Sequence, residues 1–258
     1  MNLLPIMLKA GAEVLRVYAT DFAVAAKGDA SPVTEADQAA EAIILRGLAE
    51  LAPEIPVVAE EEAAAGRIPA AAKRFFLVDP LDGTKEFISR NGEFTVNIAL
   101  IEDGAPVLGA VYAPALGQIY WGGPDGAFMA NITDGALGTA VPIHVRTAPA
   151  AITAVGSRSH GGAETEAFLK AFMVAEFKPA GSSLKLCLLA SGDADIYPRM
   201  GRTMEWDIAA GDAVLRAAGG RVETLDGQPL LYGKRDQSND ADFANPYFVA
   251  FGDPNLRA

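Results

Sequence analysis

The strongest constraint on the fold is an apolar run that leads directly into two carboxylates. The four residues FFLV at 75–78 predict a buried strand, and DPLDGT follows at 79–84. Pro80 restricts Asp79 to extended geometry, and Gly83 permits a backbone conformation that other residues avoid. Asp79 and Asp82 can therefore point the same way, with the Leu81 carbonyl between them. Oxygen ligands at this close spacing suit a hard cation such as Mg²⁺.

Further acidic positions strengthen this interpretation. Glu60 and Glu61 follow another short apolar strand, and carboxylates clustered there would repel one another without a cation. Asp207 opens a predicted helix. Each position also has a structural alternative: an Asx turn for the aspartate pair, the solvated start of a helix for the two glutamates, and a helix N-cap for Asp207.

Hydrophobic periodicity predicts a mixed α/β chain in two lobes. Helices are expected over residues 3–19, 35–51 with Thr34 as N-cap, 164–172, 184–190 and 206–218. Strands are expected over residues 57–59, 75–78, 94–101, 106–112, 118–121, 126–130, 152–155, 221–223 and 248–251. The texture changes near 145–149, which predicts a metal-binding N-terminal α+β lobe, 1–147, and a C-terminal α/β lobe, 148–258, that completes the active site and substrate pocket.

Composition excludes several classes of protein. Half of the 258 residues are hydrophobic, enough for a large core, and the apolar neighbours of the single Cys187 favour a buried residue over a nucleophile. The net charge of −12 disfavours nucleic-acid binding, so an anionic substrate needs metal ions or a local basic patch. The lack of a signal-peptide pattern and of a long apolar run predicts a cytoplasmic protein without a transmembrane segment, with peripheral contact at the inner membrane left open.

Three motifs occur in an order and spacing typical of one family. Glu60-Glu61, DPLDGT at 79–84 and WDIAAG at 206–211 resemble those of the inositol monophosphatase superfamily, over most of the chain. The resemblance implies a Mg²⁺-dependent, Li⁺-sensitive phosphatase with a layered α/β/α/β/α fold. Four further segments, at 31–37, 157–160, 181–185 and 195–199, resemble the CysQ-type 3′(2′),5′-bisphosphate nucleotidases, which hydrolyse 3′-phosphoadenosine 5′-phosphate to AMP and phosphate.

The resemblance also implies a role for each site residue. Two or three Mg²⁺ ions per active site would be held by Glu60, Asp79, Leu81 through its carbonyl, Asp82 and Asp207. The attacking water would be oriented and deprotonated by Thr84 with Asp37, and Glu60 is grouped with them as catalytic. The residues expected to contact substrate are Asp82, Gly83, Thr84, Lys85, His160, Ser183, Lys185, Arg199 and Asp207.

Two alternative functions remain at this stage. An inositol monophosphatase or a broad-specificity sugar or cyclitol phosphatase would share the metal ligands but would not need Lys185 and Arg199. A non-catalytic module that binds a divalent cation would not need Thr84 beside Asp37. The sequence leaves open whether the protein is a monomer or a homodimer, whether Mg²⁺ or Mn²⁺ is preferred, and which of residues 60–62 binds metal.

Overall fold

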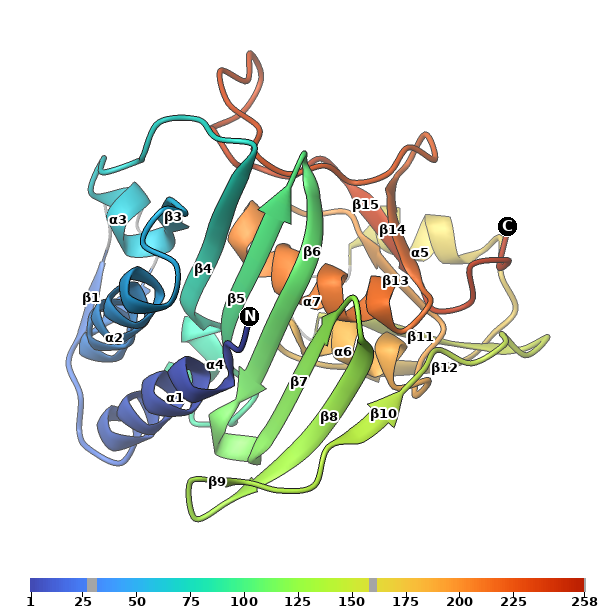
Figure 1. Cartoon of the computed structure of the whole chain (residues 1–258). Helices are drawn as coiled ribbons and strands as arrows, with labels where there is room; N and C mark the ends of the chain where they lie inside the picture. Colours follow the sequence, from blue (N-terminus) through green and yellow to red (C-terminus); the bar gives the residue numbers. More distant parts are fainter. Residues whose placement is uncertain (27–31, 158–161, 258) are drawn as a thin grey trace.

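The computed structural model describes residues 1–26, 32–157 and 162–257 and shows a layered mixed α/β fold (Figure 1). An outer helix pair, α1 (Leu4–Tyr18) and α2 (Glu35–Leu51), covers one face of a large sheet. A second pair, α6 (Leu184–Ala190) and α7 (Glu205–Ala217), lies between that sheet and a smaller one. Helix α5 (Ala163–Leu169) packs on the other face of the smaller sheet. The predicted α/β/α/β/α fold class is confirmed.

The large sheet contains eight strands within the described residues. Their order is β10-β8-β7-β6-β5-β4-β3, with β9 paired to β8. Only β3 and β4 run parallel; the other neighbours are antiparallel. The strands are β3 (Val57–Ala59), β4 (Arg74–Asp82), β5 (Thr95–Glu102), β6 (Ala105–Ala113), β7 (Gln118–Gly123), β8 (Gly126–Thr133), β9 (Ala136–Leu137) and β10 (Val141–Ile143).

The smaller sheet has the order β12-β11-β13-β15-β14. Its strands are β11 (Ile152–Gly156), β12 (Val174–Pro179), β13 (Ile196–Arg199), β14 (Arg221–Thr224) and β15 (Phe248–Phe251). The remaining short elements are β1 (Val24–Ala26), β2 (Pro32–Thr34), α3 (Glu60–Ala64), α4 (Thr84–Ile88) and the 3₁₀ turn Pro114–Leu116. None of the helices within the described ranges is both long and apolar enough to cross a bilayer.

Helix α7 lies at the centre of the fold, because two glycines of the large sheet let it approach closely. A Cβ atom at Gly109 would lie 2.5 Å from the Ala210 carbonyl oxygen, and one at Gly122 would lie 2.7 Å from the Val214 Cα. Such distances are too short for real contacts, so neither of these two positions tolerates a side chain beneath the helix. The close packing fixes the distance between α7 and the large sheet, and therefore the position of Asp207 relative to that sheet.

We expect Gly109→Ala to lower the free energy of unfolding by about 1–3 kcal/mol, because the added methyl group would collide with the backbone of α7. Thermal denaturation measures the change. Gly201→Ala is the matched control, since its added methyl group would meet no atom closer than 3.7 Å. If Gly109→Ala melted at the wild-type temperature, the helix would not be held as closely as described.

The structure departs from the predicted elements at several places. The strand expected over 75–78 continues to Asp82, with an irregular register between Asp79 and Asp82 where Pro80 supplies no N–H. Helix α4 and strands β12 and β13 were not predicted. The predicted division at residues 147 and 148 falls between β10 and β11 and stays a prediction.

Candidate active site

Strand β4 delivers the first two carboxylates. Asp79 is 1% exposed and lies opposite Asn97 of β5, whereas Asp82 lies opposite Thr95. The Leu81 N–H donates to Asp79 Oδ1 at 2.9 Å, which holds the buried carboxylate against the strand. Gly83, at φ 89°, then turns the chain into α4. The expected Asx-type bond is therefore present, and it is compatible with a second role for the same carboxylate.

Hydroxyl groups from a distant part of the chain hold Asp82. Ser182 Oγ donates to Asp82 Oδ2 at 2.6 Å, and Ser183 Oγ lies 3.0 Å from the same oxygen. Ser183 Oγ also lies 2.6 Å from the Asp207 carbonyl oxygen. Ser183 therefore connects the end of β4 to the first turn of α7, two segments that are more than 100 residues apart.

Asp207 occupies the third position of α7, and not the N-cap position expected from the sequence. Met204 is the N-cap, with extended backbone, and its N–H donates to Asp207 Oδ2 at 2.9 Å. The helix starts two residues before Asp207, at Glu205, which is fully buried and accepts hydrogen bonds from N–H groups of a distant loop. Gly233 donates to Glu205 Oε2 at 2.6 Å and Lys234 to Oε1 at 2.9 Å. Glu205, an acid without a role in the sequence analysis, thus fixes the loop over α7.

The four predicted acidic ligands are close enough to perturb one another. Burial and then the charges of Glu60, Asp82 and Asp207 raise the pKa of Asp79 well above its ordinary value. Burial and then the charges of Asp82 and Glu60 do the same to the pKa of Asp207. Within the described residues, however, no three acidic, histidine or cysteine side chains form a ready-made metal site. The site is thus a set of crowded oxygen donors that a cation would draw together.

Thr84 and Asp37 come together across 47 residues of sequence. Thr84 Oγ1 lies 3.4 Å from Asp37 Oδ1 and 3.3 Å from the Leu81 carbonyl oxygen. Asp37 is 1% exposed, and both the N–H and the hydroxyl of Thr34 donate to its Oδ2 at 2.8 Å. Although Asp37 lies early in a helix, where a polar residue could equally face solvent, α2 turns this side chain toward the end of β4.

The three glutamates of α3 differ in their surroundings. Among these three glutamates, it is Glu60 whose charge adds to burial in raising the pKa of Asp79. Glu62 forms a bidentate ion pair with Arg67 near the surface, in which Nε and Nη2 of the guanidinium each donate to one carboxylate oxygen at 2.6 Å. These contacts favour Glu60 over Glu62 as the acid that belongs to the cluster.

Two of the basic side chains that are predicted to contact substrate lie near the carboxylates. Lys185 is 6% exposed, and its Nζ donates to the Ser182 carbonyl at 2.5 Å; burial lowers its pKa to about 8. Arg199, half-buried at the end of β13, donates to the Arg202 carbonyl at 3.2 Å, and its charge offsets part of the rise that burial and the neighbouring acids cause in the pKa of Asp207. Lys185 therefore supports the turn that carries Ser182, in addition to any contact with substrate.

The remaining predicted residues divide between exposed, core and undescribed positions. Lys85 is exposed directly after the β4 turn. His160 lies outside the described residues. Cys187 is fully buried, and burial raises the pKa of its thiol, which agrees with the predicted core position. Leu186 packs against Gly211 of α7, where a Cβ atom would lie 2.6 Å from a Leu186 methyl carbon.

Sequence reasoning missed the polar residues of β5. Thr95 Oγ1 lies 2.6 Å from Ser182 Oγ and donates to Asn97 Oδ1 at 3.1 Å, and Asn97 Nδ2 donates to Ser183 Oγ at 3.0 Å. Both β5 residues are buried. Polar residues alternating within an otherwise apolar strand are the one signal that could have revealed them.

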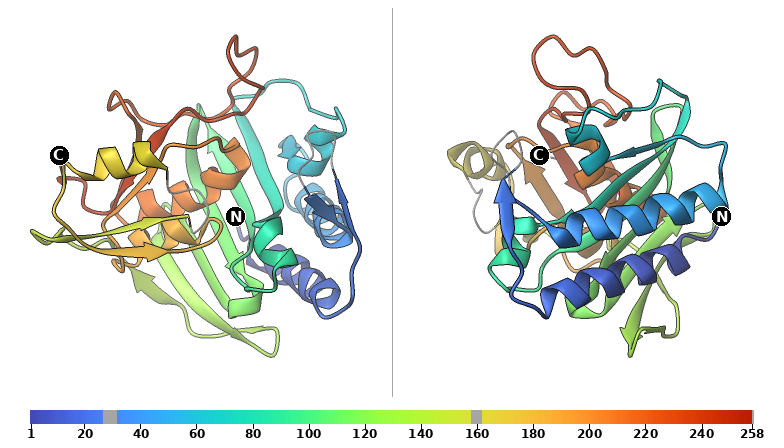
Figure 2. Two further views of the ribbon diagram at one scale, coloured as in Figure 1. Left: turned by 180° about the vertical axis from the view of Figure 1, so that it is seen from behind. Right: turned by 90° about the vertical axis from the view of Figure 1, so that its left-hand side faces the viewer.

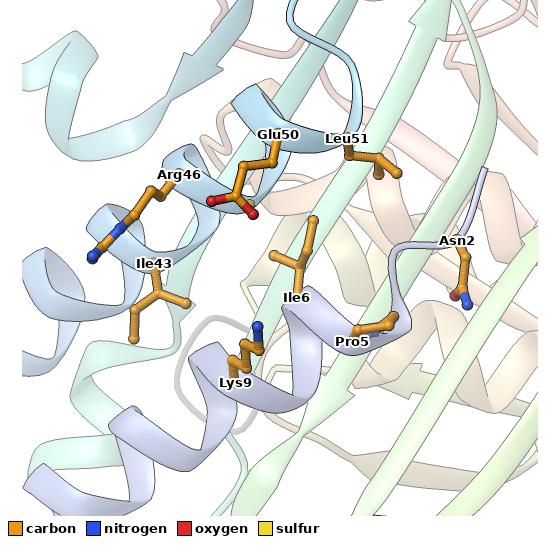
Figure 3. Close-up of a pocket in the computed structure, with 9 residues that line it drawn as sticks. Asn2, Pro5, Ile6, Lys9, Ile43, Arg46, Glu50 and Leu51 are labelled. Atoms are coloured by element: carbon orange, nitrogen blue, oxygen red, sulfur yellow. The ribbon is translucent and has the colours of Figure 1, made fainter.

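A surface cavity lies well apart from these residues. It occupies about 650 Å³ between α1 and α2 and is lined by residues such as Ile6, Lys9, Ile43 and Glu50 (Figure 3). None of the predicted site residues lines it. In the right-hand view of Figure 2, this helix pair faces the viewer and lies in front of the large sheet.

A layered α/β fold with crowded carboxylates beside a helix N-terminus and two cationic side chains is typical of metal-dependent phosphatases. The chain belongs to the inositol monophosphatase family, whose model matches residues 4–245. It is 45% identical over 241 residues to the 3′(2′),5′-bisphosphate nucleotidase CysQ of Escherichia coli O157:H7, covering 93% of this chain and 94% of that protein.

Two further relatives agree. The 3′(2′),5′-bisphosphate nucleotidase CysQ of Salmonella typhimurium is 46% identical over 241 residues, again 93% of this chain and 94% of the relative. The crystal structure of CysQ from Bacteroides thetaiotaomicron, a bacterial member of the inositol monophosphatase family, is 35% identical with a TM-score of 0.79, covering 98% of this chain and 96% of that one. The family resemblance seen in the sequence motifs is confirmed.

Proposed function

We propose that this chain is a Mg²⁺-dependent 3′(2′),5′-bisphosphate nucleotidase that hydrolyses 3′-phosphoadenosine 5′-phosphate to AMP and phosphate. The observation that carries the proposal is the convergence of Asp79, Asp82 and Asp207 with Arg199 and Lys185 on one side of the fold. A bisphosphate brings two anionic groups to one site. Cations held by the oxygen ligands would bind one of these phosphates, and fixed basic side chains would bind the other.

The donor set fits a hard divalent cation. Glu60, Asp79 and the Leu81 carbonyl would hold one Mg²⁺, and Asp79, Asp82 and Asp207 a second; a third ion belongs to the same proposal. When bound, the cations would lower the pKa of water and offset the phosphate charge. Burial, and then repulsion from the neighbouring acids, raises the pKa of Asp79 and of Asp207, and a positive charge among these acids would offset that repulsion.

The protein's own groups would orient the reaction. Asp37, held by Thr34, accepts a hydrogen bond from Thr84, and this pair would position the attacking water and take its proton. The water oxygen bonds to phosphorus and the bond from phosphorus to the ribose 3′ oxygen breaks. The proton of the attacking water passes to Asp37 and then to solvent, and the leaving 3′ oxygen takes a proton from solvent as AMP departs. The partial positive charge at the start of α7 would favour the phosphate, although the Glu205 N–H itself donates to the Phe243 carbonyl oxygen at 2.8 Å.

Substrate selection would use the residues around Ser183. In this proposal Arg199 contacts the non-scissile phosphate, while Lys185 fixes the 180–182 turn from beneath and adds positive charge. Gly83, Thr84 and Lys85 would lie beside the scissile phosphate, and His160 remains a predicted substrate contact. Cytoplasmic location with contact to the membrane surface left open, and a monomeric or homodimeric state, are retained as predictions.

The experiment that tests the function is phosphate release from 3′-phosphoadenosine 5′-phosphate and from inositol 1-phosphate, each with Mg²⁺ and with chelator. We expect Mg²⁺-dependent turnover with at least about a 10-fold preference in kcat/KM for the nucleotide, the discrimination expected from about 1.4 kcal/mol of differential binding at the extra phosphate. Preference for inositol 1-phosphate would assign the chain to the alternative activity. Turnover that survives the chelator would remove the metal assignment.

A further inference from the structure

The helix that carries Glu60 begins without a side-chain cap of its own. The N-cap of α3 is Ala59, with extended backbone, and it supplies no capping hydrogen bond. The first N–H groups of any helix have no partner within the helix, so they need one from elsewhere. Because α3 is only five residues long, its position depends on that external partner.

The partner is a buried acid on α2. Glu41 is 4% exposed, and its two carboxylate oxygens accept two consecutive backbone N–H groups: Glu61 at 2.8 Å to Oε2 and Glu62 at 3.1 Å to Oε1. Burial, together with the charges of Glu61 and Glu62, raises the pKa of Glu41 to about 7. The cost of burying a carboxylate here is offset by the two hydrogen bonds that it accepts from backbone N–H groups.

This pair of hydrogen bonds sets which glutamate faces the cluster. Successive side chains on a helix are rotated by about 100°, so a shift of one residue would point a different acid toward Asp79. In the observed position of α3, the carboxylate of Glu60 is close enough to Asp79 to contribute to its raised pKa, whereas Glu62 forms an ion pair with Arg67. Glu41 therefore fixes the register within a run of three identical residues.

Glu41 also lies one helical turn beyond Asp37. Residues four apart share a face of a helix, and both of these acids are buried. Asp37 reaches Thr84 after β4, and Glu41 reaches the start of α3. One face of α2 thus sets the position of the proposed water-orienting pair and of a proposed metal ligand together.

We propose that Glu41 is a positioning residue: its carboxylate holds the start of α3 so that Glu60, and neither Glu61 nor Glu62, joins Asp79 in the metal site. The proposal rests on the proposed role of Glu60 as a ligand. It assigns Glu41 no contact with metal or substrate.

The test is Glu41→Gln, with Glu41→Ala as a larger change. Glutamine keeps the length of the side chain but turns an NH₂ group toward one of the two N–H groups. We expect Mg²⁺ affinity, measured by calorimetry on the substrate-free protein, to fall about 10- to 100-fold, as for other residues that orient ligands. The KM for the nucleotide at saturating Mg²⁺ should stay within about 2-fold. Amide hydrogen exchange over residues 60–64 should become faster.

The matched control is Glu50→Gln, which removes a carboxylate from an exposed position on the same helix. It should leave Mg²⁺ affinity unchanged. Wild-type Mg²⁺ affinity in Glu41→Gln would overturn the proposal even if the melting temperature fell, because that result describes a purely structural residue. A wild-type protein that needs no Mg²⁺ would instead overturn the proposed function, so the two failures are distinguishable.

Discussion

Asp79→Asn should reduce turnover of 3′-phosphoadenosine 5′-phosphate by at least about 10³-fold while the protein stays folded. Asp79 is the buried carboxylate that Glu60, Asp82 and Asp207 surround, and the proposal places it on both cations. A metal site supplies several kcal/mol of transition-state stabilisation, and each 1.4 kcal/mol is a factor of ten in rate. Steady-state kinetics with a Mg²⁺ titration measures the loss.

The fold should survive this substitution for a stated reason. Asparagine retains the oxygen that accepts the Leu81 N–H, and it removes a negative charge from a crowded, buried position. In metal-free buffer the variant should therefore melt at the wild-type temperature or above. Asp134→Asn, an exposed turn residue at φ 51°, is the control and should change neither property. A folded Asp79→Asn protein with a near-normal rate would refute the metal assignment.

Elements with a strong local signal could be predicted from the sequence. Helix α2 begins after Thr34 and ends at Leu51 as expected, because a polar cap precedes a long amphipathic stretch. Helix α6 also has the predicted bounds. Strand β13 was missed because Pro198 argues against a strand. The sheet accommodates it because β13 pairs with β11 only at Ile196, so Pro198 has a strand partner, Val249, on one side alone.

In the site, too, residues with a local sequence signal could be predicted, whereas contacts between distant residues could not. The family motifs identified Asp79, Asp82 and Asp207, because a carboxylate after a buried strand or at a helix start is a local feature. The network that holds Asp82 could not be predicted, since it joins Thr95 to Ser182 across 87 residues. Burial of Lys185 was equally hidden: a lysine in a helix start looks the same in sequence whether it meets solvent or backbone carbonyls.

The acids around the site share one structural use. Asp37, Glu41, Glu205 and Asp207 each accept a backbone N–H, from Thr34, Glu61, Gly233 and Met204 respectively, at 2.6–2.9 Å. Backbone amides carry partial positive charge without a mobile side chain, so they stabilise buried carboxylates in a chain with a net charge of −12. The structural and proposed chemical roles of Asp37 and Asp207 therefore coexist. In both cases the hydrogen bond from the N-cap residue to the acid at the third helical position orients the side chain.

Thr84→Val should lower kcat by about 10²–10⁴-fold, the range of general acid–base catalysis, with a change in KM below about 3-fold. Valine has nearly the shape of threonine, so the packing of α4 is preserved, but the group 3.4 Å from Asp37 Oδ1 and 3.3 Å from the Leu81 carbonyl can no longer donate or accept a hydrogen bond. Steady-state kinetics at saturating Mg²⁺ separates the two parameters.

Thr84→Ser decides whether the hydroxyl itself is responsible. Serine restores the oxygen without the methyl group and should recover kcat to within about 10-fold of wild type, because the hydrogen bond to Asp37 can form again. Mg²⁺ affinity should be the same in both variants, since the Leu81 backbone carbonyl is present in each. If Thr84→Val lowered Mg²⁺ affinity and left kcat intact at saturation, Thr84 would serve the metal site through Leu81, and the water-orienting role would pass to Asp37 alone.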